Sequence, residues 1–226
     1  MKLPLHLLSL TSEQTSKLEA FADFLLAYNK HTNLTSITDP TEFVIKHLED
    51  TLALVKQCDW QAKKVLDVGS GGGFPGIVLL IMHPSIELTM IEATGKKVEF
   101  LRLALRHLDL TATVVHARAE DWIKNNREAF DIVTARAVAP LQVLIEWCVP
   151  YVKVGGMFVA MKSRVEEELK SATNCIEKTG GTIREIVPYT LSMDMGERSL
   201  VIVNKVTATP KEYPRPNRII QREAMK

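Results

Sequence analysis

The chain has 226 residues, of which 46% are hydrophobic and 24% are charged, and its formal net charge at pH 7 is +1. These values are typical of a folded globular protein and exclude collagen-like, coiled-coil and intrinsically disordered chains. The tightest apolar cluster ends at His83, well short of the roughly 18 to 20 residues that a membrane-spanning helix needs. Three widely spaced cysteines indicate neither a disulfide framework nor a zinc site, so we expect a cytoplasmic protein.

The first part of the chain predicts two helices. Thr11 and Gln14 form a capping-box pattern ahead of one apolar helical face, and Asp39 with Pro40 begins a second one. Near the other end, residues 205–226 hold 6 basic and 2 acidic side chains. This is weak evidence for a polyanionic partner, because a terminal run of charge is more often a solvated end. We therefore expect a helical cap over residues 1–60, a core over 61–206 and a basic tail over 207–226.

Strand and helix patterns alternate through the core. The expected strands are KVLDVG, IELTMIE, TATVVHA, FDIVTA and GGMFVAMK, and the expected helices span residues 75–83, 96–108, 141–149 and 164–178. Such alternation predicts a parallel sheet with helices on both faces. Two more strands, 182–190 and 200–206, follow with no room for a helix between them, which predicts an antiparallel hairpin. The expected fold is α/β, Rossmann-like, with a mainly parallel seven-stranded sheet.

The stretch VLDVGSGGGFPG runs from a buried strand into a glycine turn. Gly71, Gly73 and Gly76 match the G-x-G-x-x-G pattern of NAD sites, but this match begins several residues after the strand and contains a proline. Gly69, Gly71 and Gly73 instead give G-x-G-x-G at the strand end, with Asp67 two residues before the first glycine. An acid at Asp67 would repel a pyrophosphate but suits the cationic sulfonium and amino groups of S-adenosylmethionine. We favour S-adenosylmethionine.

Acidic residues close the next two strands. Glu92 follows Gly73 by 19 residues. At this spacing a carboxylate can accept hydrogen bonds from both ribose hydroxyls of either cofactor. The alternative is that Glu92 is simply an exposed acid at a strand end. After the third strand, Ala119 and Glu120 are candidates to bind the edge of an adenine ring, Ala119 through its backbone. Glu120 and Asp121 also fit the first turn of a helix, where acids are favourable. Both interpretations stay open.

The fourth strand ends at Arg136, at the edge where open α/β proteins place their reacting groups. No Asn-Pro-Pro-Tyr-like stretch, cysteine nucleophile or Lys-Asp-Lys-Glu set accompanies it, which disfavours methylation of an exocyclic amine, a pyrimidine carbon or a ribose hydroxyl. Arg136 is either an orienting cation or a surface ion-pair partner.

Several stretches together resemble one family over nearly the whole chain: NLTSITDPTEFVIKHLEDTLAL, LDVGSGGGFPGI, IEATGKKVEFL, ARAED, ARAVAPL, GGMFVAMK, GERSLVIVNK and EYPR. They are similar to the ribosomal small-subunit methyltransferase G family, also called glucose-inhibited division protein B. This resemblance implies a class I methyltransferase that uses S-adenosylmethionine to methylate N7 of one guanine in the decoding-region loop of 16S rRNA. After Arg215 the chain departs from the family pattern, which weakens the expectation that its tail contacts RNA.

The family's cofactor positions fall here on Gly69, Phe74, Ala119, Glu120 and Arg136. Glu92 lies at the strand end expected for the ribose. The placement agrees with that from the residues, except that Phe74 is implied by the resemblance alone and that Arg136 is placed beside the cofactor by the resemblance.

The implied chemistry needs no general base, because N7 of guanine carries a free lone pair at neutral pH. Catalysis is then mostly positioning, and we assign no catalytic acid or base, with Arg136 as an orienting candidate. The implied partner is 16S rRNA or the small ribosomal subunit, assembling or mature, bound by a monomer without a metal. Candidate phosphate contacts are Arg118, Lys162, Arg164, Arg198 and Arg215.

Three alternatives remain open on the sequence. A small-molecule methyltransferase would share the cofactor residues, and a nicotinamide-dependent oxidoreductase would use the offset glycine match. A non-catalytic rRNA-binding module would retain the pocket without methyl transfer.

Overall fold

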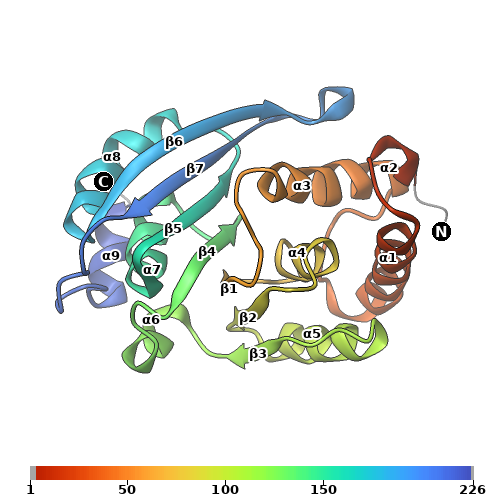
Figure 1. Ribbon diagram of the computed structural model, residues 1–226, viewed down its shortest axis with the longest axis horizontal. Helices are drawn as coiled ribbons and strands as arrows, with labels where there is room; N and C mark the ends of the chain where they lie inside the picture. The colour runs from red at the N-terminus through yellow and green to blue at the C-terminus, as the bar shows by residue number, and fades with distance from the viewer. Residues whose placement is uncertain (1–3, 225–226) are drawn as a thin grey trace.

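A seven-stranded sheet forms the centre of the protein (Figure 1), whose computed structural model describes residues 4–224. The strand order is β3-β2-β1-β4-β5-β7-β6, with β1 to β5 parallel and β7 antiparallel to both of its neighbours. The expected mainly parallel sheet with a terminal antiparallel hairpin is thus confirmed. The strands span β1 Lys64–Val68, β2 Glu87–Glu92, β3 Thr113–His116, β4 Phe130–Arg136, β5 Val152–Lys162, β6 Gly181–Thr190 and β7 Glu197–Lys205.

Helices cover both faces of the sheet (Figure 1). One face carries α1 Ser12–Thr32, α2 Pro40–Phe43, α3 Asp50–Val55, α4 Gly76–Met82 and α5 Gly95–His107. The other carries α6 Ala119–Trp122, α7 Leu141–Cys148, α8 Glu166–Lys178 and α9 Asn217–Ala224. Short 3₁₀ turns occupy Leu5–Leu7, Ile123–Asn125, Val149–Tyr151 and Ser192–Asp194. No helix within residues 4–224 is both long enough and apolar enough to cross a bilayer.

The two faces of the sheet bury alternate residues of the same strands. In β1, Val65 belongs to the hydrophobic core on the α4 side, and Leu66 belongs to the core on the α7 side. In β5, Val159 and Phe158 divide in the same way. Parallel strands buried on both faces need continuous apolar runs, which explains why the core strands are rich in Val, Ile and Leu.

The first helices are part of the sheet's covering layer. Thr11 and Gln14 form the expected capping box at the start of α1. From α1, Phe21 packs on Phe74 with ring centroids 5.3 Å apart, in the same core as Ile77 of α4. The segment expected to be a cap over 1–60 therefore shares its hydrophobic core with residues that follow β1.

The second amino-terminal helix contains a π-helical segment, Val44–Glu49, between α2 and α3. As expected, Asp39 caps its start by accepting hydrogen bonds from the backbone N–H groups of Thr41 and Glu42. Single π turns inside α-helices are rare and occur often at functional sites. Here the segment carries His47 and is followed directly by Asp50, two residues of the site described below.

The basic tail folds back onto the protein. The Arg127 guanidinium donates hydrogen bonds to three backbone carbonyls of the tail, among them that of Thr209 at 2.9 Å. Beyond these contacts lies α9, which the sequence did not predict, and its Ile220 is fully buried where α9 packs on α7. Arg215 lies between two carboxylates, Glu146 of α7 and Glu223 of α9. The tail is therefore anchored by both apolar and ionic contacts.

We expect Arg215→Ala to lower the free energy of unfolding by about 3 kcal/mol, because it leaves the fully buried Glu146 carboxylate without its cation. Urea denaturation measures this change. Arg218→Ala removes an exposed arginine of α9 and should change the stability by less than about 0.5 kcal/mol. Equal effects of the two substitutions would contradict the anchoring role of Arg215.

Candidate functional site

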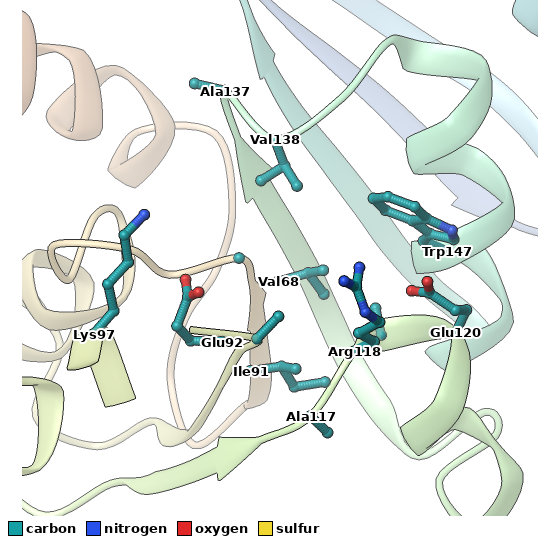
Figure 2. A pocket seen from close by; sticks show the side chains of 13 residues that line it. Val68, Ile91, Glu92, Lys97, Ala117, Arg118, Glu120, Ala137, Val138 and Trp147 are labelled. Carbon is teal, nitrogen blue, oxygen red and sulfur yellow. The ribbon is translucent and has the colours of Figure 1, made fainter. Parts of the chain in front are cut away.

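A pocket of about 310 Å³ opens at the carboxyl ends of β1 to β4 (Figure 2). This is the edge at which open α/β sheets bind their ligands. Figure 2 shows Glu92 on one side of this first pocket and Glu120 with Trp147 on the other. Its lining residues are Val68, Gly69, Ile91, Glu92, Ala93, Lys97, Ala117, Arg118, Ala119, Glu120, Ala137, Val138 and Trp147.

The glycine turn contributes Gly69 to the wall of the first pocket, whereas Gly71 and Gly73 are not among the residues that line it. The φ angles of Gly69, Gly71 and Gly73 are +74°, +54° and +91°, in the left-handed region that favours glycine. A Cβ at Gly69 would lie 2.6 Å from a methyl carbon of Val138, so a side chain does not fit there. The turn is fixed to β2 because the Gly69 N–H donates to the Ile91 carbonyl at 2.8 Å.

Gly76, the last glycine of the NAD-like match, lies beneath the turn and does not line the pocket. Its N–H donates to Asp67 Oδ2 at 3.1 Å, and a Cβ at Gly76 would lie 2.7 Å from that oxygen. The glycine at this position therefore serves the packing of α4 on β1. The pocket is lined instead by Gly69, the first glycine of the G-x-G-x-G pattern.

Asp67 is a fully buried carboxylate of β1, directly before Val68 and Gly69, which line the pocket. Burial raises the pKa of Asp67 to about 6, and the nearby Glu92 adds to this rise. The Ser70 side chain, the Gly76 N–H bond and the charge of Arg136 oppose it. The second oxygen of Asp67, Oδ1, has no hydrogen-bond partner among the residues that the structure describes. A buried acceptor without a partner is costly, and a donor from a ligand would satisfy it.

Glu92 links the glycine turn to the end of β2. Its Oε2 accepts a hydrogen bond from the Gly71 N–H at 3.0 Å, and its Oε1 accepts one from the Thr94 N–H at 2.8 Å. Each carboxylate oxygen has two lone pairs, so one acceptor position remains on each. The side chain is only 6% exposed and lines the pocket, which suits it to bind two neighbouring hydroxyls.

Ala119 and Glu120 line the pocket at the start of α6, where Glu120 is also an acid of the helix first turn. That they bind the adenine edge stays a prediction. The Ala119 carbonyl accepts a hydrogen bond from the Tyr151 hydroxyl at 2.5 Å, which fixes this wall. Lys97 and Trp147 also line the pocket and were not predicted, because each lies inside a helix that the pattern assigned only to packing.

Arg136 lies outside the first pocket and lines a second one of about 370 Å³. The two pockets share Ala137, the residue that follows Arg136 at the end of β4. The Arg136 guanidinium donates to Asp50 Oδ2 at 3.2 Å, to the Lys46 carbonyl at 3.2 Å and to His47 Nδ1 at 3.1 Å. It also lies 4.9 Å from the centre of the Phe74 ring. Arg136 is therefore held in one orientation.

His47 is a site residue that the sequence did not identify. Burial, with the charge of Arg136, lowers its pKa to about 3, so the ring is neutral. A guanidinium can only donate hydrogen bonds, so Nδ1 of His47 accepts one from Arg136 and the ring proton is on Nε2. This Nε2 lies 3.0 Å from Thr35 Oγ1. The His47 ring stacks on the Phe74 ring, with centroids 4.4 Å apart. Phe74 is buried and is not among the residues that line either pocket. Both nitrogens of His47 are thus engaged.

The phosphate-contact candidates fall in different places. Arg118 lines the first pocket, and Lys162 and Arg198 line the second. Arg164 is exposed beside Glu197, and the guanidinium of Arg215 is paired with Glu146 of α7 and Glu223 of α9. Within residues 4–224, no group of three or more His, Cys, Asp or Glu side chains is placed to hold a metal ion.

Comparison with known proteins places this chain in a family. The model of the rRNA small subunit methyltransferase G family matches residues 14–193. The chain belongs to this family. Ribosomal RNA small subunit methyltransferase G of Desulfitobacterium hafniense is 40% identical over 92% of this chain and 88% of its own length. The protein of the same name from Staphylococcus aureus is 42% identical over 93% and 90%. The family resemblance seen in the sequence is confirmed.

Solved structures agree on the fold. A precorrin-6y C5,15-methyltransferase from Geobacter metallireducens matches with a TM-score of 0.54 and 18% identity, covering 69% of this chain and 87% of that one. A putative O-methyltransferase from Klebsiella pneumoniae matches with a TM-score of 0.56 and 17% identity, covering 81% and 90%. These likenesses show a Rossmann-like methyltransferase fold, as expected for the class I methyltransferases.

Proposed function

We propose that this protein uses S-adenosylmethionine to methylate N7 of one guanine in the decoding-region loop of 16S rRNA, on an assembling or mature small ribosomal subunit. The observation that carries the proposal is the first pocket, which Gly69 of the glycine turn and Glu92 line in a chain of this family. The buried Asp67 carboxylate lies two residues before Gly69. Membership of the family supports rRNA as the substrate.

The residues of the first pocket fit the proposed methyl donor. The spare acceptor positions of Glu92 suit the two ribose hydroxyls, and the wall at Ala119 and Glu120 suits the adenine edge. The buried Asp67, with its unpartnered Oδ1, supplies a negative charge near the place where a cationic amino group would lie. When bound, S-adenosylmethionine supplies a methyl group activated by a sulfonium.

The protein's own part in the reaction is positioning. Guanine N7 has a free lone pair, so no side chain has to remove a proton from it. The imidazole of His47 in the second pocket is not free to act as a general base, because its two nitrogens are engaged by Arg136 and Thr35. Arg136 is fixed by its three acceptors and is placed to orient the guanine.

The destination of the methyl group tests the substrate class. Purified protein is incubated with methyl-labelled S-adenosylmethionine and either unmodified small ribosomal subunits or an extract of small metabolites. We expect the label in 16S rRNA. Label recovered only in metabolites would contradict the proposal and identify a small-molecule methyltransferase. Binding of 16S rRNA without any methyl transfer would identify a non-catalytic RNA-binding module.

The affinity for S-adenosylmethionine should rise with pH between 5 and 7. Because burial raises the pKa of Asp67 to about 6, this carboxyl is mostly protonated at pH 5 and mostly ionised at pH 7. Only the ionised form attracts the cationic amino group, so binding should be about tenfold weaker at pH 5. Calorimetric titration of the wild type and of Asp67→Asn measures this. Asp67→Asn should bind weakly at every pH, and an unchanged pH dependence in this variant would exclude Asp67 as its cause.

A further inference from the structure

The positively charged side chains that line the second pocket outnumber its one carboxylate, that of Asp50. The pocket is lined by Ile37, Lys46, His47, Asp50, Arg136, Ala137, Met161, Lys162, Ser163 and Arg198. Two of its cations have carboxylates of their own outside the lining. Lys46 pairs with Glu42 at 3.1 Å, and Lys162 pairs with Glu168 at 2.8 Å.

Asp50 is shared by the two arginines of this pocket. Its Oδ2 accepts a hydrogen bond from Arg136 at 3.2 Å, and its Oδ1 accepts one from the Tyr189 hydroxyl at 2.7 Å. The Nε atom of Arg198 lies 3.8 Å from Oδ1, beyond hydrogen-bond distance. One carboxylate thus faces two guanidinium groups, which leaves a surplus positive charge.

Arg198 keeps donors for a ligand, whereas Arg136 is largely engaged by the protein. The Arg198 side chain is 24% exposed, and its Nη1 donates to the adjacent Glu197 carbonyl at 2.9 Å. A guanidinium has five N–H donors, so several stay available toward the pocket. Paired N–H groups of arginine match the oxygens of a phosphate in a bidentate geometry.

We propose that the second pocket binds the phosphate of the nucleotide that is methylated, with Arg198 as its main ligand. The inference rests on the proposed function, because it takes an RNA nucleotide as the acceptor. A guanine extruded from its helix or loop would then extend from this phosphate toward Ala137, the residue common to both pockets. Because Arg136 and Arg198 share the single carboxylate of Asp50, one positive charge is left unneutralised, and this charge selects an anion.

Arg198→Ala tests the proposal, with Arg184→Ala as the matched control. Arg184 is an exposed arginine of the same β6–β7 hairpin, and it does not line the second pocket. Loss of one phosphate contact should raise the KM for unmodified small subunits about tenfold and lower the slope of log KM against log salt by about 1. The affinity for S-adenosylmethionine should stay within twofold of the wild type, and Arg198→Lys should recover part of the loss.

The control should match the wild type in KM and in salt slope. If Arg198→Ala also matches the wild type while the wild type methylates rRNA, the phosphate site is wrong and the proposed function stands. If the wild type binds S-adenosylmethionine and methylates no RNA, both proposals fail. The two failures are therefore distinguishable.

Inhibition by free nucleotides gives a second readout that does not depend on RNA binding elsewhere. Guanosine 5′-monophosphate should inhibit methyl transfer by the wild type about tenfold better than guanosine does, because only the nucleotide carries the phosphate. Arg198→Ala should reduce this ratio to about one. A ratio that is equally large in wild type and Arg198→Ala would overturn the assignment of Arg198.

Discussion

Glu92→Ala should weaken S-adenosylmethionine binding at least about 100-fold. Hydrogen bonds to a charged group contribute about 1.5 to 3 kcal/mol each, and the substitution removes two acceptor positions proposed for the ribose. It also releases the Gly71 and Thr94 N–H groups that Glu92 holds at 3.0 and 2.8 Å. Calorimetric titration with S-adenosylmethionine measures the loss.

Glu87→Ala is the matched control, since Glu87 lies at the other end of the same strand and its side chain is 71% exposed. It should bind the cofactor as tightly as the wild type does. Binding by Glu92→Ala within threefold of this control would contradict the assignment of Glu92 to the ribose and would leave it a purely structural strand-end acid.

Arg136→Ala should lower the turnover of rRNA methylation about 100-fold while cofactor affinity changes by less than about threefold. The reason is that Arg136 lines the second pocket and not the first, held by Asp50, His47 and the Lys46 carbonyl. Misplacing a reacting group by about 1 Å can cost about 100-fold in rate. Single-turnover kinetics at saturating cofactor separates this effect from binding.

Arg136→Lys should recover little of the activity, because a lysine keeps the charge without the planar fork that contacts three acceptors. Arg106→Ala, which removes an exposed arginine of α5 outside both pockets, should behave as the wild type. A loss of cofactor affinity equal to the loss of turnover in Arg136→Ala would instead place Arg136 at the methyl donor, as the family's cofactor position implies.

The first pocket could be anticipated because its residues follow local patterns. Gly69 and Glu92 each lie directly at the end of an apolar strand, and parallel strands bring their carboxyl ends to one edge. The glycine spacing and the acid at Asp67 together favoured S-adenosylmethionine over NAD. The sheet was predictable for the same reason, since strand and helix periods alternate clearly through the core.

The second pocket could not be anticipated because it depends on contacts between distant segments. Asp50 and Arg136 are 86 residues apart, and Tyr189 reaches Asp50 across 139 residues. No spacing in the sequence connects them. The orientation of His47 depends on a π-helical segment that the apolar pattern of a regular helix does not reveal.

The tail illustrates a different limit of prediction from sequence. Its basic composition was visible, but α9 is a short helix of 8 residues that depends on tertiary packing, with Ile220 buried and Arg215 paired to Glu146. Short isolated helices are marginal in water, so their formation is decided by what they pack against.

The most direct test of the proposed reaction is the identity of the methylated nucleoside. Small subunits from cells lacking this modification are treated with the protein and labelled S-adenosylmethionine, and the 16S rRNA is digested to nucleosides for mass spectrometry. We predict labelled 7-methylguanosine, at most one per subunit, and a strong reduction with Arg136→Ala. A label on any other nucleoside, or no labelled nucleoside from a protein shown to bind the cofactor, would contradict the assignment to guanine N7.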